Sequence, residues 1–124
     1  MRILVAEDEP ILLKTIHLRL IKDGHEVINA ADGKQAIQEI NDKGPDLVIT
    51  DIMMPFSSGL EVLNCAKQNI HKKIRVIMLT AMGQENMVIE AFKLGADDYV
   101  TKPFSPNELA MRVRRFELNN AVRP

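Results

Sequence analysis

Short apolar runs recur along the chain and end abruptly at polar residues. The first run, residues 3–6, stops at the acidic triplet of residues 7–9, as a strand buried on both faces of a sheet does. Four further runs of the same kind follow it. Together, the predicted strands cover residues 3–6, 26–31, 47–49, 74–79 and 99–100.

Between these runs, apolar residues recur at the spacing of a helix that buries one face. The first helix is predicted to begin at Pro10, because proline is tolerated at the first helical position, and to end at Gly24. In the fourth helix, we expect Val88, Ala91 and Phe92 to face the core. The apolar positions that predict the other four helices are Ile11, Leu12, Ile16 and Leu20; Ala36, Ile37 and Ile40; Leu60, Leu63 and Ala66; and Leu109, Val113 and Phe116.

The order of these elements predicts the fold class. A chain of 124 residues has room for one domain. Five strands that alternate with five helices are typical of βαβ units with right-handed crossovers. We therefore expect an α/β, doubly wound domain, in which helices cover both faces of a parallel five-stranded sheet. The domain is expected to span residues 1–119, followed by a polar C-terminal tail at residues 120–124.

Composition and charge narrow the class of protein. The chain is 46% hydrophobic and 27% charged, which is enough apolar material for a core. Its net charge of -1 argues against nucleic-acid binding through overall charge, so no direct nucleic-acid contact is expected. Cys65 has no partner for a disulfide, and neither a signal peptide nor a membrane-length apolar run is present. These features predict a cytoplasmic protein that makes no contact with a membrane.

Candidate chemistry gathers where the predicted strands end. In open α/β sheets, ligands bind beyond the carboxyl ends of the strands. Glu7 and Asp8 follow the first strand and Asp51 follows the third. Thr80 follows the fourth strand and Lys102 the fifth. The sequence therefore predicts that carboxylates, a hydroxyl and an ammonium group meet at one edge of the sheet.

Carboxylates crowded together repel each other, and a hard divalent cation offsets this repulsion. Mg²⁺, or Mn²⁺, is the expected ion, with Asp8, Asp51 and the main-chain carbonyl of Met53 as ligands. A carboxylate in such a site can attack phosphorus and form an aspartyl phosphate. Lys102 would then balance one phosphoryl oxygen, and Thr80 would hold another.

Each of these residues also has an ordinary structural interpretation. Asp8 or Glu9 could be the N-cap of the first helix, and Asp51 could be a turn residue. A threonine after a strand is usually a loop hydroxyl, and a lone lysine is usually solvated. Four strands that deliver complementary groups to one edge are nevertheless improbable as an accident of capping. The functional interpretation is therefore preferred.

Four segments of the chain resemble the receiver domain of two-component response regulators. They are residues 3–10 (ILVAEDEP), 46–55 (DLVITDIMMP), 79–81 (LTA) and 95–104 (GADDYVTKPF). The resemblance runs from Arg2 to about Leu118, which is nearly the whole chain. It implies a flavodoxin-like (βα)5 sheet with strand order 2-1-3-4-5.

The resemblance also implies a role for each site residue. Asp51 is the expected phospho-acceptor, which takes the phosphoryl group from a phosphohistidine of a cognate histidine kinase. Glu7 and Asp8 form the acidic pocket, with the longer Glu7 reaching the metal through water. Lys102 and Thr80 bind the phosphoryl group. Such a domain is a regulatory module rather than an enzyme, since it catalyses only its own phosphorylation and dephosphorylation.

A switch is implied as well, in which Thr80 moves toward the phosphoryl group and Tyr99 rotates inward. The surface of helix four, strand five and helix five would then change and recruit an effector or a second copy of the chain. In the final third, which resembles receivers linked to winged-helix domains, three charged residues fit the salt bridges of such a homodimer. At two further positions, where such receivers often have the charged partners of these salt bridges, this chain has uncharged residues. The three residues are Asp97, Glu108 and Arg112, and the replacements are Val88 and Asn119.

The family often has a cis peptide at its Lys-Pro pair, so Lys102-Pro103 is a candidate. Met53 and Met82 flank the expected phosphoryl site where many relatives carry polar residues. An apolar neighbour positions a hydrolytic water poorly, so slow self-dephosphorylation is expected.

Two other classes remain open. A flavodoxin-like cofactor carrier needs a loop rich in Gly, Ser and Thr after the first strand, where this chain has acidic residues 7–9. A phosphatase with an aspartyl nucleophile needs a second acid two residues beyond the first, and that position is Met53.

Overall fold

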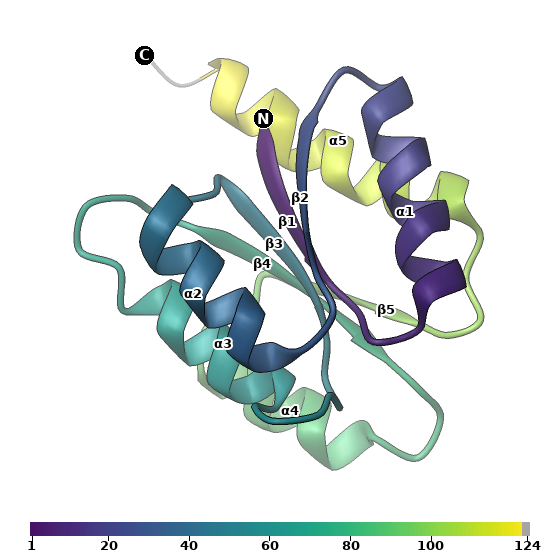
Figure 1. Cartoon of the computed structure of the whole chain (residues 1–124), viewed down its shortest axis with the longest axis vertical. Coiled ribbons are helices and arrows are strands. Elements are labelled where there is room, and N and C mark those ends of the chain that lie inside the picture. The colour runs from purple at the N-terminus through teal and green to yellow at the C-terminus, as the bar shows by residue number, and fades with distance from the viewer. Residues whose placement is uncertain (123–124) are drawn as a thin grey trace.

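The computed structural model describes residues 1–122, and for residues 119–122 it describes the backbone alone. Within residues 1–122, five strands and five helices alternate (Figure 1). In chain order they are β1 (Arg2–Ala6), α1 (Pro10–Lys22), β2 (Glu26–Ala30), α2 (Gly33–Lys43), β3 (Leu47–Asp51), α3 (Gly59–Lys67), β4 (Arg75–Thr80), α4 (Glu85–Lys93), β5 (Asp98–Thr101) and α5 (Pro106–Val122).

The strands form one parallel sheet in the order β2-β1-β3-β4-β5. Helices α1 and α5 cover one face, and α2, α3 and α4 cover the other (Figure 1). Because each crossover contains a helix, all five strands run the same way, and their carboxyl ends share one edge. The predicted fold class and strand order are confirmed.

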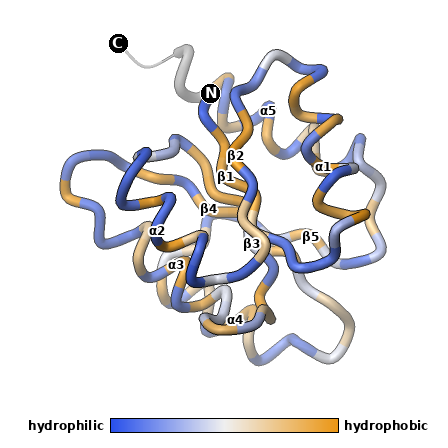
Figure 2. The backbone as a smooth tube through the Cα atoms, viewed as in Figure 1, coloured by the Kyte–Doolittle hydropathy of each residue, from blue (hydrophilic) through white to orange (hydrophobic). Residues whose placement is uncertain are grey.

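Two hydrophobic clusters, one on each face, hold the layers together. Alternate residues of a strand point to opposite faces, so Leu4 of β1 joins the cluster beneath α2 and α3, whereas Ile3 joins the one beneath α1 and α5. Figure 2 shows hydrophobic residues concentrated along the central strands and hydrophilic ones in the loops. Burial on both faces explains why these strands appear in the sequence as continuous apolar runs.

The start of α3 fixes the end of β3. Ser58 and Glu61 form a capping box, in which each side chain bonds the other residue's backbone N–H. Gly59 packs so closely on β3 that a Cβ atom there would collide with the main-chain carbonyl of Asp51. This contact needs glycine, and it holds the backbone of Asp51 against the first turn of the helix.

The first four strands differ from their predicted ranges by one or two residues at their ends, and the structure differs from the sequence predictions in three further places. Phe92 is 45% exposed, so the prediction that it faces the core is wrong; Ala91 is the buried residue of α4. Strand β5 extends one residue further at each end than predicted. Helix α5 continues through Val122, three residues into the predicted tail, while residues 123–124 and the side chain of Asn119 lie outside the described residues.

The division of the chain at residue 119 stays a prediction. In the part of the chain that the structure describes, none of the helices combines the length and the apolar character needed to cross a membrane.

Candidate functional site

The predicted site residues converge at the carboxyl edge of the sheet. Glu7 and Asp8 directly follow β1, and Asp51 is the last residue of β3. Their carboxylates offer oxygen atoms that all lie within 4.8 Å of one another. Thr80 ends β4, and Lys102 directly follows β5. Parallel strands therefore bring together groups that are far apart in the sequence.

Lys102 is the centre of the ion pairs in this cluster. Its Nζ atom lies 2.6 Å from Oδ2 of Asp51 and 2.8 Å from Oε1 of Glu7. Glu9 is a weaker partner, with an oxygen 3.6 Å from the same nitrogen. Burial lowers the pKa of the Lys102 ammonium, but the hydrogen bonds that it donates to Asp51 and Glu7 outweigh this effect and raise the pKa above its ordinary value. Lys102 is therefore a permanent cation in the site.

Glu7 is the most deeply buried carboxylate of the site. Its side chain is fully buried, and burial raises its pKa to about 7. The hydrogen bond from Lys102 opposes this rise, whereas the neighbouring charge of Asp51 adds to it. The cluster of Glu7, Asp8 and Asp51 thus has one ammonium group beside it, which pairs with Glu7 and Asp51. Oxygen ligands with surplus negative charge are what a hard divalent cation requires, so these residues fit Mg²⁺.

The backbone after β3 holds the carboxylate of Asp51 in place. The N–H of Met53 donates to Oδ1 at 3.1 Å, while Oδ2 points to Lys102. The hydroxyl of Thr50 donates to the main-chain carbonyl of Asp51 at 3.0 Å. Asp51 is buried, yet it is held at the open edge of the sheet by contacts on both oxygens. Metal coordination by the Met53 carbonyl stays a prediction.

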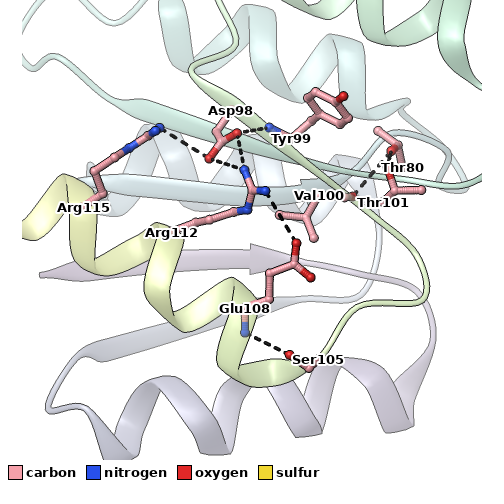
Figure 3. Close-up of polar contacts among 9 residues, drawn as sticks. All are labelled: Thr80, Asp98, Tyr99, Val100, Thr101, Ser105, Glu108, Arg112 and Arg115. Atoms are coloured by element: carbon pink, nitrogen blue, oxygen red, sulfur yellow. Dashed lines mark hydrogen bonds and ion pairs between the residues drawn. The ribbon is translucent and has the colours of Figure 1, made fainter.

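Thr80 and Tyr99 are close in space but face different ways (Figure 3). The buried hydroxyl of Thr80 lies 3.5 Å from the carbonyl of Val100 and 3.5 Å from the hydroxyl of Thr101. Tyr99 is 41% exposed, and its ring packs edge-on against Phe92, with ring centroids 5.8 Å apart. Both Thr80 and Tyr99 line a cavity of about 400 Å³ between α4 and β5.

The side of β5 that faces α5 carries a charge network that the sequence reasoning missed. Asp98 accepts hydrogen bonds from Arg112 at 2.9 Å and Arg115 at 3.4 Å (Figure 3). Asp97, which was expected to join a dimer salt bridge, pairs within the chain with Lys67 at 2.7 Å, and its role in a dimer stays a prediction. Two adjacent aspartates differ in role because neighbouring positions face opposite ways, and no sequence signal shows which of them faces α5.

The capping interpretation of the acidic triplet is not supported. Glu9 occupies the N-cap position of α1, but its side chain makes no capping hydrogen bond. Its backbone N–H instead donates to Oε2 of Glu7 at 3.2 Å. On the other side of the site, the Lys102–Pro103 peptide bond is cis, and the N–H of Lys102 donates to the carbonyl of Thr80 at 2.7 Å.

Comparisons with known proteins agree with this geometry. The family model of the response regulator receiver domain matches residues 3–114. The phosphate regulon transcriptional regulatory protein PhoB of Escherichia coli is 39% identical over 114 residues, which are 91% of this chain and 50% of that protein. The alkaline phosphatase synthesis transcriptional regulatory protein PhoP of Bacillus subtilis is 39% identical over 115 residues, which are 91% of this chain and 47% of that protein. The chain spans about half the length of these curated relatives.

Solved structures of similar length share the fold. The receiver domain of the Francisella response regulator 1452 superposes with a TM-score of 0.84 and is 37% identical, covering 96% of this chain and 98% of that one. The chemotaxis response regulator CheY4 of Vibrio cholerae also gives 0.84, with 28% identity over 93% of this chain and 97% of that one.

Proposed function

The chain belongs to the family of response regulator receiver domains of two-component systems, and on that premise we propose that Asp51 is its phospho-acceptor. The observation that carries the proposal is the position of Asp51 at the carboxyl end of β3, beside Lys102, Glu7 and Asp8. A histidine kinase phosphohistidine is the proposed donor. The output is a change in the surface formed by α4, β5 and α5.

In the proposed step, an oxygen of the Asp51 carboxylate attacks the phosphorus of the donor phosphohistidine. A new O–P bond forms at Asp51 as the N–P bond breaks; the electron pair goes to the ring nitrogen, which takes a proton from solvent, and a neutral imidazole leaves. Lys102, now 2.6 Å from Oδ2, is placed to pair with a phosphoryl oxygen as charge builds up there. A carboxylate oxygen attacks without the help of a general base.

A divalent cation, Mg²⁺ or Mn²⁺, would neutralise phosphoryl charge in this site. The residues proposed to hold it are Asp8 and Asp51 directly, Glu7 through water, and Met53 through its main-chain carbonyl. Support comes from the carboxylate oxygens that lie within 4.8 Å of one another and from the surplus negative charge around buried Glu7.

Thr80 and Tyr99 are the proposed relay to the output surface. A phosphoryl group on Asp51 offers strong acceptor oxygens, which would draw the Thr80 hydroxyl away from Val100 and Thr101. The cavity that Thr80 and Tyr99 both line would then admit the Tyr99 ring from its exposed position. Such a change converts a local charge into a new shape of the α4-β5-α5 surface.

The proposed partners follow from the same scheme. They are a cognate histidine kinase and an effector protein or effector domain; a homodimer through α4, β5 and α5 is a further proposal. The curated relatives are transcriptional regulators about twice as long as this chain, so any contact with nucleic acid is assigned to an effector region rather than to this domain. We assign it a regulatory role in which the chemistry is its own phosphorylation and dephosphorylation.

Beryllofluoride, an analogue of the phosphoryl group, tests the site without a kinase. We expect it to bind the wild-type chain in the presence of Mg²⁺, as measured by calorimetry, and to move the Tyr99 signals in NMR spectra. Asp51→Asn should abolish binding, whereas Asp42→Asn, which changes an exposed aspartate of α2, should not. Unaltered binding by Asp51→Asn would exclude this assignment of the acceptor.

A further inference from the structure

Phe56 stands out in the loop that follows β3 because its backbone is in the left-handed region, with φ of 71°. Bulky L-residues rarely adopt this conformation, which glycine or asparagine adopts at lower cost. The N–H of Ser57 donates to the carbonyl of Pro55 at 2.9 Å, so Phe56 is the central residue of a tight γ-turn.

Packing does not explain the aromatic side chain at this position. Phe56 is 83% exposed and belongs to neither hydrophobic cluster. The turn is held by backbone contacts that do not involve the phenyl ring. Gly33 at the start of α2 donates its N–H to the carbonyl of Pro55 at 3.4 Å, and a Cβ atom at Gly33 would collide with the carbonyl of Ser57. The fold thus constrains a strained turn through Gly33 and leaves the phenyl ring in solvent.

Strain that is retained around an exposed side chain points to a use for that side chain. Rigid, exposed aromatic residues are typical anchors of protein interfaces, because they bury a large area and lose little conformational freedom on binding. Phe56 follows Asp51 by five positions, and Met53 between them is both hydrogen-bonded to Asp51 and 54% exposed. Phe56 therefore belongs to the same loop as Met53, whose N–H holds the acceptor carboxylate.

We propose that Phe56 is a docking anchor for the phosphohistidine-bearing domain that delivers the phosphoryl group to Asp51. This inference rests on the proposed function. The side chain of Asp51 is only 10% exposed, so a donor held on a protein must bring its surface against the loops that border the site. The loop of residues 53–57 is such a border. A protein that binds only α4, β5 and α5 does not need this loop.

The test compares two phosphoryl donors on the same variants. The protein donor is the autophosphorylated cytoplasmic part of the histidine kinase that labels the wild-type chain fastest, among those encoded by the same genome. The small donor is acetyl phosphate, which needs no docking surface. For each variant, the measured quantity is the rate of transfer from the kinase divided by the rate of labelling by acetyl phosphate.

Phe56→Gly removes the ring and relieves the backbone strain, so its melting temperature should equal or exceed that of the wild type. The rate ratio should nevertheless fall by at least about tenfold, the loss expected when an interface anchor is removed. Phe56→Tyr keeps the ring and should retain the wild-type ratio. The control Ile70→Gly removes an apolar side chain that is 88% exposed in the loop before β4, at the opposite edge of the sheet. This variant should also retain the wild-type rate ratio.

An unchanged ratio in Phe56→Gly would overturn the inference, as would labelling by acetyl phosphate without transfer from any of the kinases. If the ratio is unchanged and Phe56→Gly instead converts a dimer into a monomer in sedimentation, the ring packs on a second copy and the inference is wrong. Failure of the proposed function is distinguishable from these results, because acetyl phosphate would then leave the wild-type Asp51 unlabelled.

Discussion

The ammonium group of Lys102 lies 2.6 Å from Oδ2 of Asp51, although 51 positions separate the two residues. The same group lies 2.8 Å from the fully buried Glu7. This arrangement places one half-buried cation among carboxylates that would otherwise repel each other. Lys102 therefore offsets this repulsion before any phosphoryl group arrives, and it already lies beside the carboxylate that would carry that group.

Replacing this cation should cost stability. Lys102→Met keeps the aliphatic stem but leaves Asp51 and Glu7 without their ion pair, so the free energy of unfolding should fall by about 1–3 kcal/mol in the presence of a chelator. Urea unfolding measures this change. Lys73→Met, at an exposed lysine, should stay within about 0.5 kcal/mol of the wild type. A Lys102→Met variant as stable as the wild type would show that the ion pairs contribute nothing net.

Mg²⁺ should stabilise the folded chain, because it binds the assembled carboxylates and not the unfolded chain. At a Mg²⁺ concentration ten times the dissociation constant, the free energy of unfolding should rise by about 1.4 kcal/mol. Asp8→Asn removes a proposed direct ligand and should abolish most of this rise. The matched variant Asp42→Asn should keep it. Equal Mg²⁺ effects in both variants would contradict the assignment of Asp8.

The two methionines beside the site should slow the loss of phosphate. Met53 and Met82 are both exposed, and neither side chain can hold a hydrolytic water by a strong hydrogen bond. Met53→Asn and Met82→Lys should each speed the release of inorganic phosphate from the phosphorylated chain, by about tenfold, which corresponds to 1.4 kcal/mol of barrier. Phosphate release no faster than in the parent chain would refute this explanation.

The sequence predicts the strands well because each is buried on both faces and so forms an uninterrupted apolar run. It also predicts the site, because the carboxyl ends of parallel strands must share an edge. The sequence does not predict features that depend on how the elements are arranged in space. Phe92 follows the helical spacing of α4 yet is exposed, and nothing in its neighbours marks Phe56 for a positive φ. Likewise, the orientation of β5 alone decides that Asp98, and not Asp97, pairs with the arginines of α5.

At the opposite edge of the sheet, His25 should make stability depend on pH. The ring is buried; its Nε2 lies 3.3 Å from Glu117 and its Nδ1 lies 3.2 Å from the N-terminal nitrogen. Burial, and then the N-terminal charge, lower the pKa of His25 below its ordinary 6.5, against the smaller opposing effects of Glu117 and Asp23. Below pH 6.5 the unfolded chain therefore binds more protons than the folded chain.

This difference in bound protons fixes the direction in which stability changes with pH. The contribution of neutral His25 to stability is complete above pH 6.5 and is lost as the pH falls from 6.5 toward the lowered pKa. Urea unfolding of His25→Gln at several pH values should show a shallower decline below pH 6.5 than the wild type. His71→Gln, which changes an exposed histidine, should decline as the wild type does. Identical pH profiles for wild type and His25→Gln would contradict the account.

The most direct test of the central claim is the intact mass of the chain after incubation with Mg²⁺ and acetyl phosphate. We expect one added phosphoryl group, about 80 Da, in the wild type, lost when Mg²⁺ is chelated and absent from Asp51→Asn. A wild-type chain that gains no mass, or an Asp51→Asn variant that gains as much as the wild type, would contradict the assignment of Asp51 as the phospho-acceptor.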